Sequence, residues 1–501
     1  MRLRHAYVAV AVTLGFLLGA LAHASYGIYI GKDLTADGSV FIGGSGDEPS
    51  SHWLVVQPRE QHEPGATITV GVTEVARYPG ELTEIPQVEE TYKYIAHYYS
   101  EFAGFPPPLT NGGLNEHGVA GRDIWSPSRD ELREMTPDPQ HGPQYSDLSR
   151  IAMQRATTAR EAVEIIGELI DEHGFSTYGG NSHMFADDQE GWVLIQMAGG
   201  QGLWVAERLA ADEVRFSYPG YILEIPDDYQ EHPDFMGSDN LIDFAVEQGW
   251  YDPEAGVPFN VNEVYGNQLG RERGFRGDMT IADFEELLME NAPNVTLEDV
   301  MAYVRDPRIS LDTTGYGQVA ELHEDTHPEL RVLWAAATAS VTTPFVPYYI
   351  GIEEVPPEFR MHRYLTSDQA AGFQDPDYAP QEATTYAFRV FKRLKYHTCE
   401  NPQVFYPDVV EALTGFEQTL IEEQDVVTRT ALALFEAGEE ELARHYLTDY
   451  SSTRSMQALE LGEALVAGVE ARTKAVFGIR PPEQAVDETR VHCYYPEYFE
   501  E

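Results

Sequence analysis

The 501-residue chain is poor in cysteine, in basic side chains and in long apolar segments. Its only cysteines, Cys399 and Cys493, are far apart, which excludes a disulfide-rich scaffold. They are compatible either with one disulfide that ties the C-terminal tail to the body or with two buried free thiols. Neither stands at the start of the chain, so neither can serve as an N-terminal nucleophile.

Basic residues are outnumbered by acidic ones, with 33 Lys and Arg against 83 Asp and Glu, for a formal net charge of −50. A surface this acidic repels nucleic acid and anionic lipid, so we expect neither as a partner. The acidic residues are scattered along the chain, which favours a solvated acidic coat over an interaction arm or a cation-binding function. Hydrophobic residues at 43% and aromatic residues at 11% are sufficient for a packed core.

The one long apolar run lies at the N-terminus and predicts a signal peptide over residues 1–24. The start is basic, residues 6–21 are almost entirely apolar, and the small residues Ala22 and Ala24 occupy the −3 and −1 positions. A retained signal anchor is the alternative, and the lack of cysteine at the cleavage point excludes lipid anchoring there. Cleavage predicts an exported protein, periplasmic or extracellular, of 477 residues starting at Ser25. Because Arg2 and Arg4 are removed, its net charge becomes −52.

The rest of the chain, residues 25–501, is predicted to form one α+β unit. We find no internal repeats or linkers in it. Alternating small and apolar residues around the turn at 35–38 predict a β-hairpin over 25–42, and residues 111–123 predict a second one. A capping box of Thr158 and Glu161 predicts a helix that ends at Gly174. A three-strand meander follows, and the part from about 407 to 480 is predicted to be helical.

Cleavage after Ala24 turns Ser25 into a candidate catalytic residue. A hydroxyl is a weak nucleophile until a base takes its proton. An N-terminal serine carries such a base in its own α-amine, whose unperturbed pKa of ~7.7–8.0 lies near working pH. The alternative is that Ser25 is merely the residue left by a signal peptidase.

Several segments, in order, resemble the secernin/dipeptidase family of N-terminal-nucleophile hydrolases. They are SYGIYIGKDLTADGSVFIGGSGDEPS at 25–50, GGLNEHGVA at 112–120, FADDQEGWVLIQMAGG at 185–200, a long segment at 317–356 and TYAFRVFKRL at 385–394. The resemblance implies an αββα sandwich, in which two antiparallel sheets lie between helix layers. It also implies metal-free and cofactor-free hydrolysis of an amide, typically in a dipeptide.

The resemblance also implies roles for three residues. Ser25 stands at the position of the family's cysteine nucleophile, and Asp47 at that of an acidic residue that orients the amine. Asn181 stands where related hydrolases place an amide that donates to the oxyanion. The sequence carries no signal for an oligomeric state.

Two departures from the family pattern leave alternatives open. Serine replaces cysteine, and Gly44 stands where the family has an arginine close before the aspartate; Arg122 is a candidate to replace that arginine in space. The alternatives are an acylase that cleaves N-acyl amides and a catalytically silent binding protein on the same scaffold.

Residues 323–327, HEDTH, match the H-E-x-x-H zinc-peptidase motif. That motif requires both histidines on one face of a helix. Pro328 disfavours a helical conformation at His327, so we expect no zinc site here and no other metal or cofactor in the chain.

Overall fold

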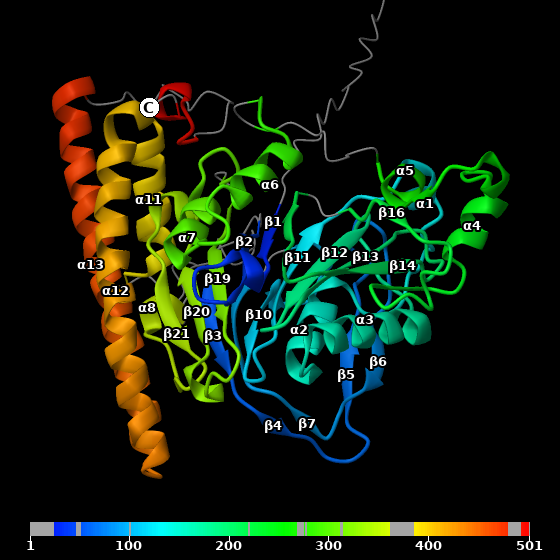
Figure 1. Ribbon diagram of the computed structural model, residues 1–501, viewed down its shortest axis with the longest axis horizontal. Coiled ribbons are helices and arrows are strands. Elements are labelled where there is room, and N and C mark those ends of the chain that lie inside the picture. The colour runs from blue at the N-terminus through cyan, green and yellow to red at the C-terminus, as the bar shows by residue number, and fades with distance from the viewer. Residues whose placement is uncertain are drawn as a thin grey trace, which may run out of the picture.

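The computed structural model describes residues 25–46, 52–99, 102–218, 221–267, 275, 278–310, 314–360, 385–478 and 492–499. Two antiparallel sheets face each other, and helices cover the outer face of each (Figure 1). The main hydrophobic cluster includes apolar side chains from both sheets. This is the predicted αββα sandwich, and the α+β fold class is confirmed.

The first sheet has six strands and carries the start of the predicted mature chain. Its order is β15 (Val214–Ser217), β1 (Tyr26–Ile30), β2 (Val40–Ser45), β19 (Gly317–Leu322), β20 (Val332–Ala336) and β21 (Val346–Tyr349). Strands β1 and β2 are the predicted hairpin, with Tyr26 opposite Ser45 and Ile30 opposite Phe41. Both strands are buried along their whole length.

The second sheet has nine strands and contains the other two predicted strand groups. Its order is β17 (Phe235–Gly237), β14 (Trp204–Leu209), β13 (Gly191–Gln196), β12 (Asn181–Ala186), β11 (Ala120–Trp125), β10 (Gly112–Asn115), β8 (Tyr94–Tyr99) and β3 (Trp53–Gln57), with β9 (Leu109–Thr110) beside β8. Strands β10 and β11 form the predicted second hairpin, and β12 to β14 form the predicted meander.

The outer face of the nine-stranded sheet is covered by α2 (Tyr145–Arg155) and α3 (Ala159–His173). Helix α3 is the helix predicted from the cap, and it ends at Gly174 with φ 82°. The Thr158 side chain accepts from the Glu161 N–H, as expected. The Glu161 carboxylate, however, accepts from the backbone N–H and hydroxyl of Thr157, one residue earlier than a capping box requires.

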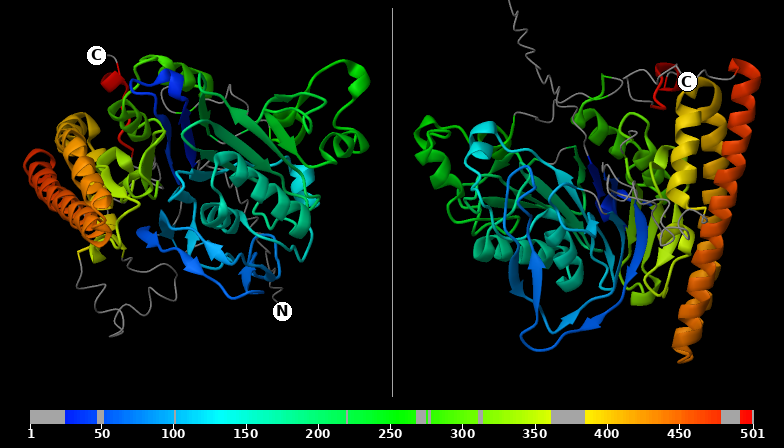
Figure 2. Two further views of the ribbon diagram at one scale, coloured as in Figure 1. Left: turned by 60° about the horizontal axis from the view of Figure 1, so that its bottom comes forward. Right: turned by 180° about the vertical axis from the view of Figure 1, so that it is seen from behind.

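The outer face of the six-stranded sheet is covered by α6 (Ile281–Met289), α7 (Leu297–Arg305), α11 (Ala387–Cys399), α12 (Pro402–Glu436) and α13 (Glu440–Phe477). The two long helices lie side by side along one edge of the molecule (Figures 1 and 2). A buried ion pair between Arg305 and Glu417 joins α12 to α7. Helix α12 begins at Pro402, earlier than predicted, because proline is tolerated at the first helical position; Pro407 lies inside the helix.

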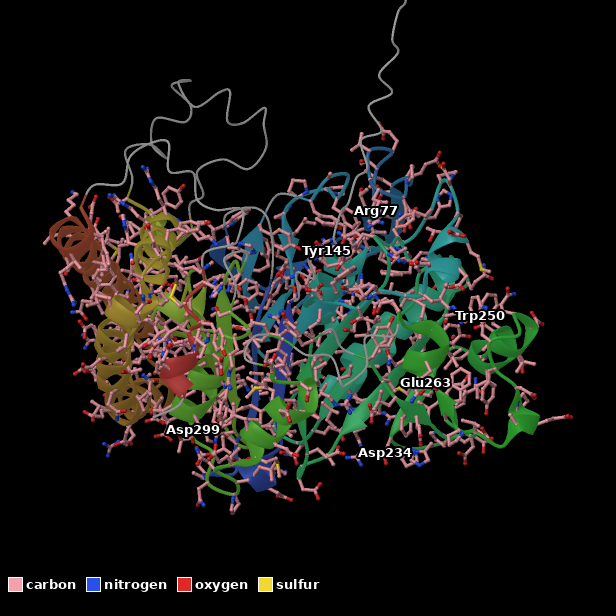
Figure 3. The ribbon with its side chains drawn as sticks, turned by 90° about the horizontal axis from the view of Figure 1, so that it is seen from above. Arg77, Tyr145, Asp234, Trp250, Glu263 and Asp299 are labelled. Carbon is pink, nitrogen blue, oxygen red and sulfur yellow. A yellow bond between two sulfur atoms is a disulfide. The ribbon has the colours of Figure 1, made fainter. Side chains whose placement is uncertain are left out.

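Cys399, the last residue of α11, forms a disulfide with Cys493 (Figure 3). Of the two alternatives left open by the sequence, the structure has the bridge that ties the C-terminal tail to the body. None of the helices in the described part of the chain combines the length and apolarity needed to cross a membrane.

Smaller elements lie outside the two main sheets and their covering helices. They are the helices α1 (Asp130–Glu134), α4 (Leu241–Glu247), α5 (Val261–Tyr265) and α8 (Pro357–Arg360), and three two-stranded ribbons: β4 (Glu60–Gln61) with β7 (Glu90–Thr91), β5 (Thr67–Val70) with β6 (Thr83–Pro86), and β16 (Glu224–Ile225) with β18 (Phe259–Asn260).

Candidate active site

Ser25 lies directly before β1 and is buried, with 6% of its surface exposed. Strand β1 is held on both sides, by β15 and by β2, so the position of Ser25 is fixed by a sheet rather than by a loop. Successive side chains of a strand alternate between the two faces of its sheet. The residues that follow Ser25 therefore show which way its side chain leaves the strand.

Ser25 belongs to the face of β1 that packs on the nine-stranded sheet. A Cβ placed on Gly27 would lie 3.1 Å from Ile124 and 3.3 Å from Met184, and one on Gly191 would lie 2.6 Å from the Tyr29 ring. Strand β1 therefore runs along β12. Gly27 lies near Met184, and Tyr29 lies nearer the C-terminal end of β12. Extrapolated backwards, this path puts Ser25 over the N-terminal end of β12, which begins at Asn181.

Asn181 is fully buried and its amide is held by three neighbours. Its Nδ2 donates to the Asp123 carboxylate at 3.3 Å and to the Ser182 carbonyl at 3.2 Å, and its Oδ1 accepts from the Tyr178 hydroxyl at 2.8 Å. An amide nitrogen has two hydrogens to donate. Asn181 is therefore oriented firmly, and it must release one of these two acceptors to donate to an oxyanion.

Asp123 is a buried member of the site that sequence reasoning missed. Its carboxylate accepts from the side-chain amides of Asn111 and Asn181. Burial raises the pKa of Asp123 to about 6, against the opposing effects of the Arg122 charge and of the two amides. Two consecutive charged residues in the otherwise apolar stretch VAGRDIW, at 119–125, are the signal that could have identified it.

Arg122 fills the space beside Gly44. Its guanidinium donates to the Tyr316 hydroxyl at 2.8 Å, to the Asp123 carbonyl at 3.1 Å and to the Ser45 carbonyl. A Cβ on Gly44 would lie 3.0 Å from the Arg122 Nε and 2.1 Å from the Tyr26 carbonyl oxygen, and Gly44 has φ 141°. A side chain at position 44 would collide with these atoms, and the Arg122 guanidinium from the facing sheet lies beside this position.

The imidazole of His97 lies close to Arg122 and is uncharged. The His97 ring stacks on Tyr316 with ring centroids 4.6 Å apart. Burial, together with the nearby Arg122 charge, lowers the pKa of His97 to about 3, so His97 is neutral at working pH. Tyr145, labelled in Figure 3, stands at the start of α2. It packs against Tyr178 with ring centroids 5.1 Å apart.

The remaining residues considered in the sequence analysis are Asp47 and the two histidines of the HEDTH segment. Asp47 lies outside the described residues. His323 and His327 lie in the connection between β19 and β20 and not on an α-helix. The His327 ring stacks on Phe435, whereas His323 contacts Glu321 and Asp37, so the two histidines do not form the zinc-peptidase pair.

The pKa of Asp123 leads to a prediction for stability. A carboxyl group whose pKa is raised in the folded state does not change the free energy of unfolding below about pH 4. As the pH rises to about 6, it increasingly lowers that free energy. A pKa of about 6 for Asp123 corresponds to a loss of about 3 kcal/mol above that range. Asp123→Asn should therefore gain stability relative to wild type by up to this amount between pH 4 and 7, measured by urea unfolding.

The control for Asp123→Asn is Asp212→Asn, which removes one carboxylate from an exposed position. A stability difference between Asp123→Asn and wild type that stays constant across this pH range contradicts the assignment.

The fold and the site together define the class of the protein: an αββα sandwich with a buried serine at the head of a strand that is paired on both sides. A model of Peptidase family C69 matches residues 24–287, more than half of the chain, and the chain belongs to that family. The protein is thus an enzyme, a hydrolase of the peptidase class. The predicted resemblance to the secernin/dipeptidase family is confirmed.

Similarity to two dipeptidases extends the match along the chain. The probable dipeptidase B of Streptococcus pyogenes serotype M3 is 22% identical over 467 residues, which cover 84% of this chain and 87% of the relative. The probable dipeptidase of Salmonella dublin is 26% identical over 266 residues, covering 52% of this chain and 56% of the relative. A solved structure of a mutant conjugated bile acid hydrolase from Clostridium perfringens is 12% identical, covers 62% of this chain and 88% of its own, and superposes with a TM-score of 0.31.

Proposed function

We propose that the protein is an exported dipeptidase of the N-terminal-nucleophile type, in which cleavage after Ala24 makes Ser25 the nucleophile and its α-amine the base. The observation that carries the proposal is the position of Ser25: buried, at the head of a strand that is paired on both sides, and facing the second sheet. The match to the family begins one residue before it. Dipeptides are the proposed substrates because relatives matched over most of the chain are named dipeptidases.

In the proposed reaction the Ser25 Oγ attacks the amide carbonyl carbon while the α-amine takes the hydroxyl proton. The C–N bond breaks, and the same proton passes to the leaving amine. Water then attacks the seryl ester, again with the α-amine as base, which releases the acid and restores Ser25. Each proton removed is returned, so no metal or cofactor is required.

Charge develops on the carbonyl oxygen during both steps. We assign its stabilisation to Asn181 together with backbone N–H groups; one such donor is typically worth about 3–4 kcal/mol in acyl transfer. Asp123 holds the Asn181 amide in place and is a positioning residue. Asp47 remains the proposed partner that orients the α-amine, and Arg122 the proposed replacement for the family's arginine.

Export is supported by the disulfide between Cys399 and Cys493, because such bonds persist in oxidising compartments. The strongly acidic composition argues against nucleic acid and anionic membrane as partners of the mature chain.

The test is turnover of amides by the exported protein. A panel of dipeptides and a panel of N-acyl amides are incubated with the protein, and free amine is measured with and without EDTA. We expect hydrolysis of dipeptides at a rate that EDTA does not change. Cleavage of N-acyl amides alone would indicate an acylase, and no turnover of either class would indicate a silent scaffold. Loss of activity that zinc restores, in a protein whose Tm EDTA leaves unchanged, would refute the metal-free mechanism.

A further inference from the structure

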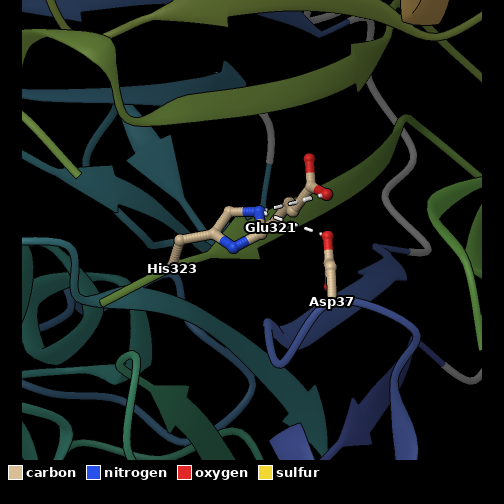
Figure 4. A group of neighbouring side chains, drawn as sticks. All are labelled: Asp37, Glu321 and His323. Carbon is tan, nitrogen blue, oxygen red and sulfur yellow. Dashed lines mark ion pairs between the residues drawn. The ribbon is translucent and has the colours of Figure 1, made fainter. Parts of the chain in front are cut away.

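Three side chains from two distant parts of the sequence converge at the end of β1 remote from Ser25. Asp37 lies in the turn of the β1–β2 hairpin, Glu321 lies on β19, and His323 follows that strand (Figure 4). Their ligand atoms all lie within 4.8 Å of one another. Among the described residues, this is the one group of three His, Cys, Asp or Glu side chains that converges in this way.

Two of the three ligand spacings, which are also within ion-pair distance, match those of groups that share an ion, and the third is at most 4.8 Å. The His323 Nε2 lies 3.3 Å from a Glu321 carboxylate oxygen and 3.6 Å from an Asp37 carboxylate oxygen. Charge-assisted hydrogen bonds between such groups are shorter, about 2.7–2.9 Å. A tetrahedral ion with ligand distances of about 2.0–2.2 Å holds its ligands roughly 3.3–3.6 Å apart.

Asp37 is oriented by its neighbour in the turn. Its Oδ1 accepts from the Ser39 backbone N–H at 3.1 Å and from the Ser39 hydroxyl at 2.7 Å, while its Oδ2 faces His323. Second partners of this kind fix the direction of metal ligands. Each ligand is at least partly accessible, with 36%, 49% and 19% of the side chain exposed for His323, Asp37 and Glu321, so an ion can reach the group from solvent.

We propose that Asp37, Glu321 and His323 bind one divalent transition-metal ion of the zinc type, with water as the fourth ligand. One imidazole with two carboxylates is a ligand set that suits zinc, whereas calcium and magnesium prefer oxygen ligands alone. Two carboxylates and a neutral imidazole also balance the charge of the ion in a chain with a net charge of −50.

The ion would clamp the tip of the β1–β2 hairpin to the end of β19. The five residues of β1, at about 3.3 Å each, separate this tip from Ser25, so the ion does not reach the reacting atoms. The site therefore contributes to the stability of the hairpin that carries Ser25 and not to the chemical step. It is independent of the proposed hydrolase function.

The test is zinc binding by the full exported chain after EDTA treatment and dialysis, measured by titration calorimetry with zinc chloride. We expect one site of defined affinity in wild type. His323→Ala, and the same-size variants Glu321→Gln and Asp37→Asn, should each weaken binding at least about 100-fold, since even loss of an outer partner typically costs 10–100-fold. Zinc should raise the Tm of wild type by about 2 °C or more and leave that of His323→Ala unchanged.

Two matched variants test the assignment. His327→Ala removes the second histidine of the HEDTH stretch, and His445→Ala removes a histidine that pairs with a single carboxylate, Asp449, at 3.8 Å. Both should retain wild-type affinity, and calcium chloride should not compete. Equal zinc affinity in wild type and in all three ligand variants, or loss of the site in His445→Ala, would overturn the proposal. Because the measurement is binding and not turnover, neither result bears on the proposed dipeptidase activity.

Discussion

Ser25→Ala is expected to reduce amide hydrolysis by about 10⁴-fold or more while the protein remains folded. Removing the nucleophile of a covalent mechanism leaves only the rate enhancement that substrate binding and the oxyanion donors supply. The variant keeps the α-amine, the backbone of β1 and a side chain of similar size, so the hairpin of β1 and β2 should form unchanged. The measurement is kcat/KM on a dipeptide cleaved by wild type, with circular dichroism to verify folding.

Two further variants separate the chemistry of Ser25 from its packing. Ser25→Cys restores a nucleophile and the residue usual in the family, and its base belongs to the main chain, so measurable activity should return. Ser452→Ala, on α13 and remote from β1, should behave as wild type. Wild-type turnover by Ser25→Ala would show that Ser25 is only the residue that signal cleavage leaves.

A covalent probe gives the same test without turnover. An acylating inhibitor should add its mass to the peptide that begins with Ser25 in wild type, and to no such peptide in the Ala variant. Label at another residue in wild type would assign the nucleophile elsewhere.

Local sequence signals predicted most of the elements that hold the site. The alternation of residues 25–42 around a turn is sufficient to specify a hairpin, and the Thr158 cap with Gly174 specifies α3, because each depends on residues close in sequence. The helical C-terminal part was predicted for the same reason. The predicted start at about residue 407 is a few residues late, because α12 already begins at Pro402.

The contacts within the site depend on how the two sheets face each other, which no local pattern encodes. Arg122 occupies the volume beside Gly44 only because β2 and β11 lie on facing sheets. The sequence suggested Arg122 as a replacement, but the raised pKa of Asp123 follows from burial that only the folded sheet creates. In the same way, the HEDTH motif pairs His323 with His327. In the folded chain, His323 instead contacts Glu321 and Asp37, the latter from the first hairpin.

Adding one residue before Ser25 is expected to lower kcat/KM by about 10²–10⁴-fold, the range that a positioned general base contributes. A glycine at this place converts the α-amine of Ser25 into an amide, which cannot take a proton from the hydroxyl, while Ser25 and its side chain are retained. The proposed mechanism therefore requires that the active chain begin at Ser25.

The experiment compares three chains produced by cutting a removable leader: one that begins at Ser25, one with glycine before Ser25, and one that begins at Ser25 and carries an extra glycine after Glu501. Intact mass verifies each terminus, and the first and third chains should have equal kcat/KM. The protein isolated from its natural site of export should have Ser25 as its N-terminal residue. If the glycine-extended chain matches the other two, the α-amine is not the base, even if Ser25 proves to be the nucleophile. A neighbouring side chain would then have to accept the proton, and because the low pKa of His97 leaves its ring neutral but weakly basic, Asp123, with a pKa of about 6, would be the first residue to test.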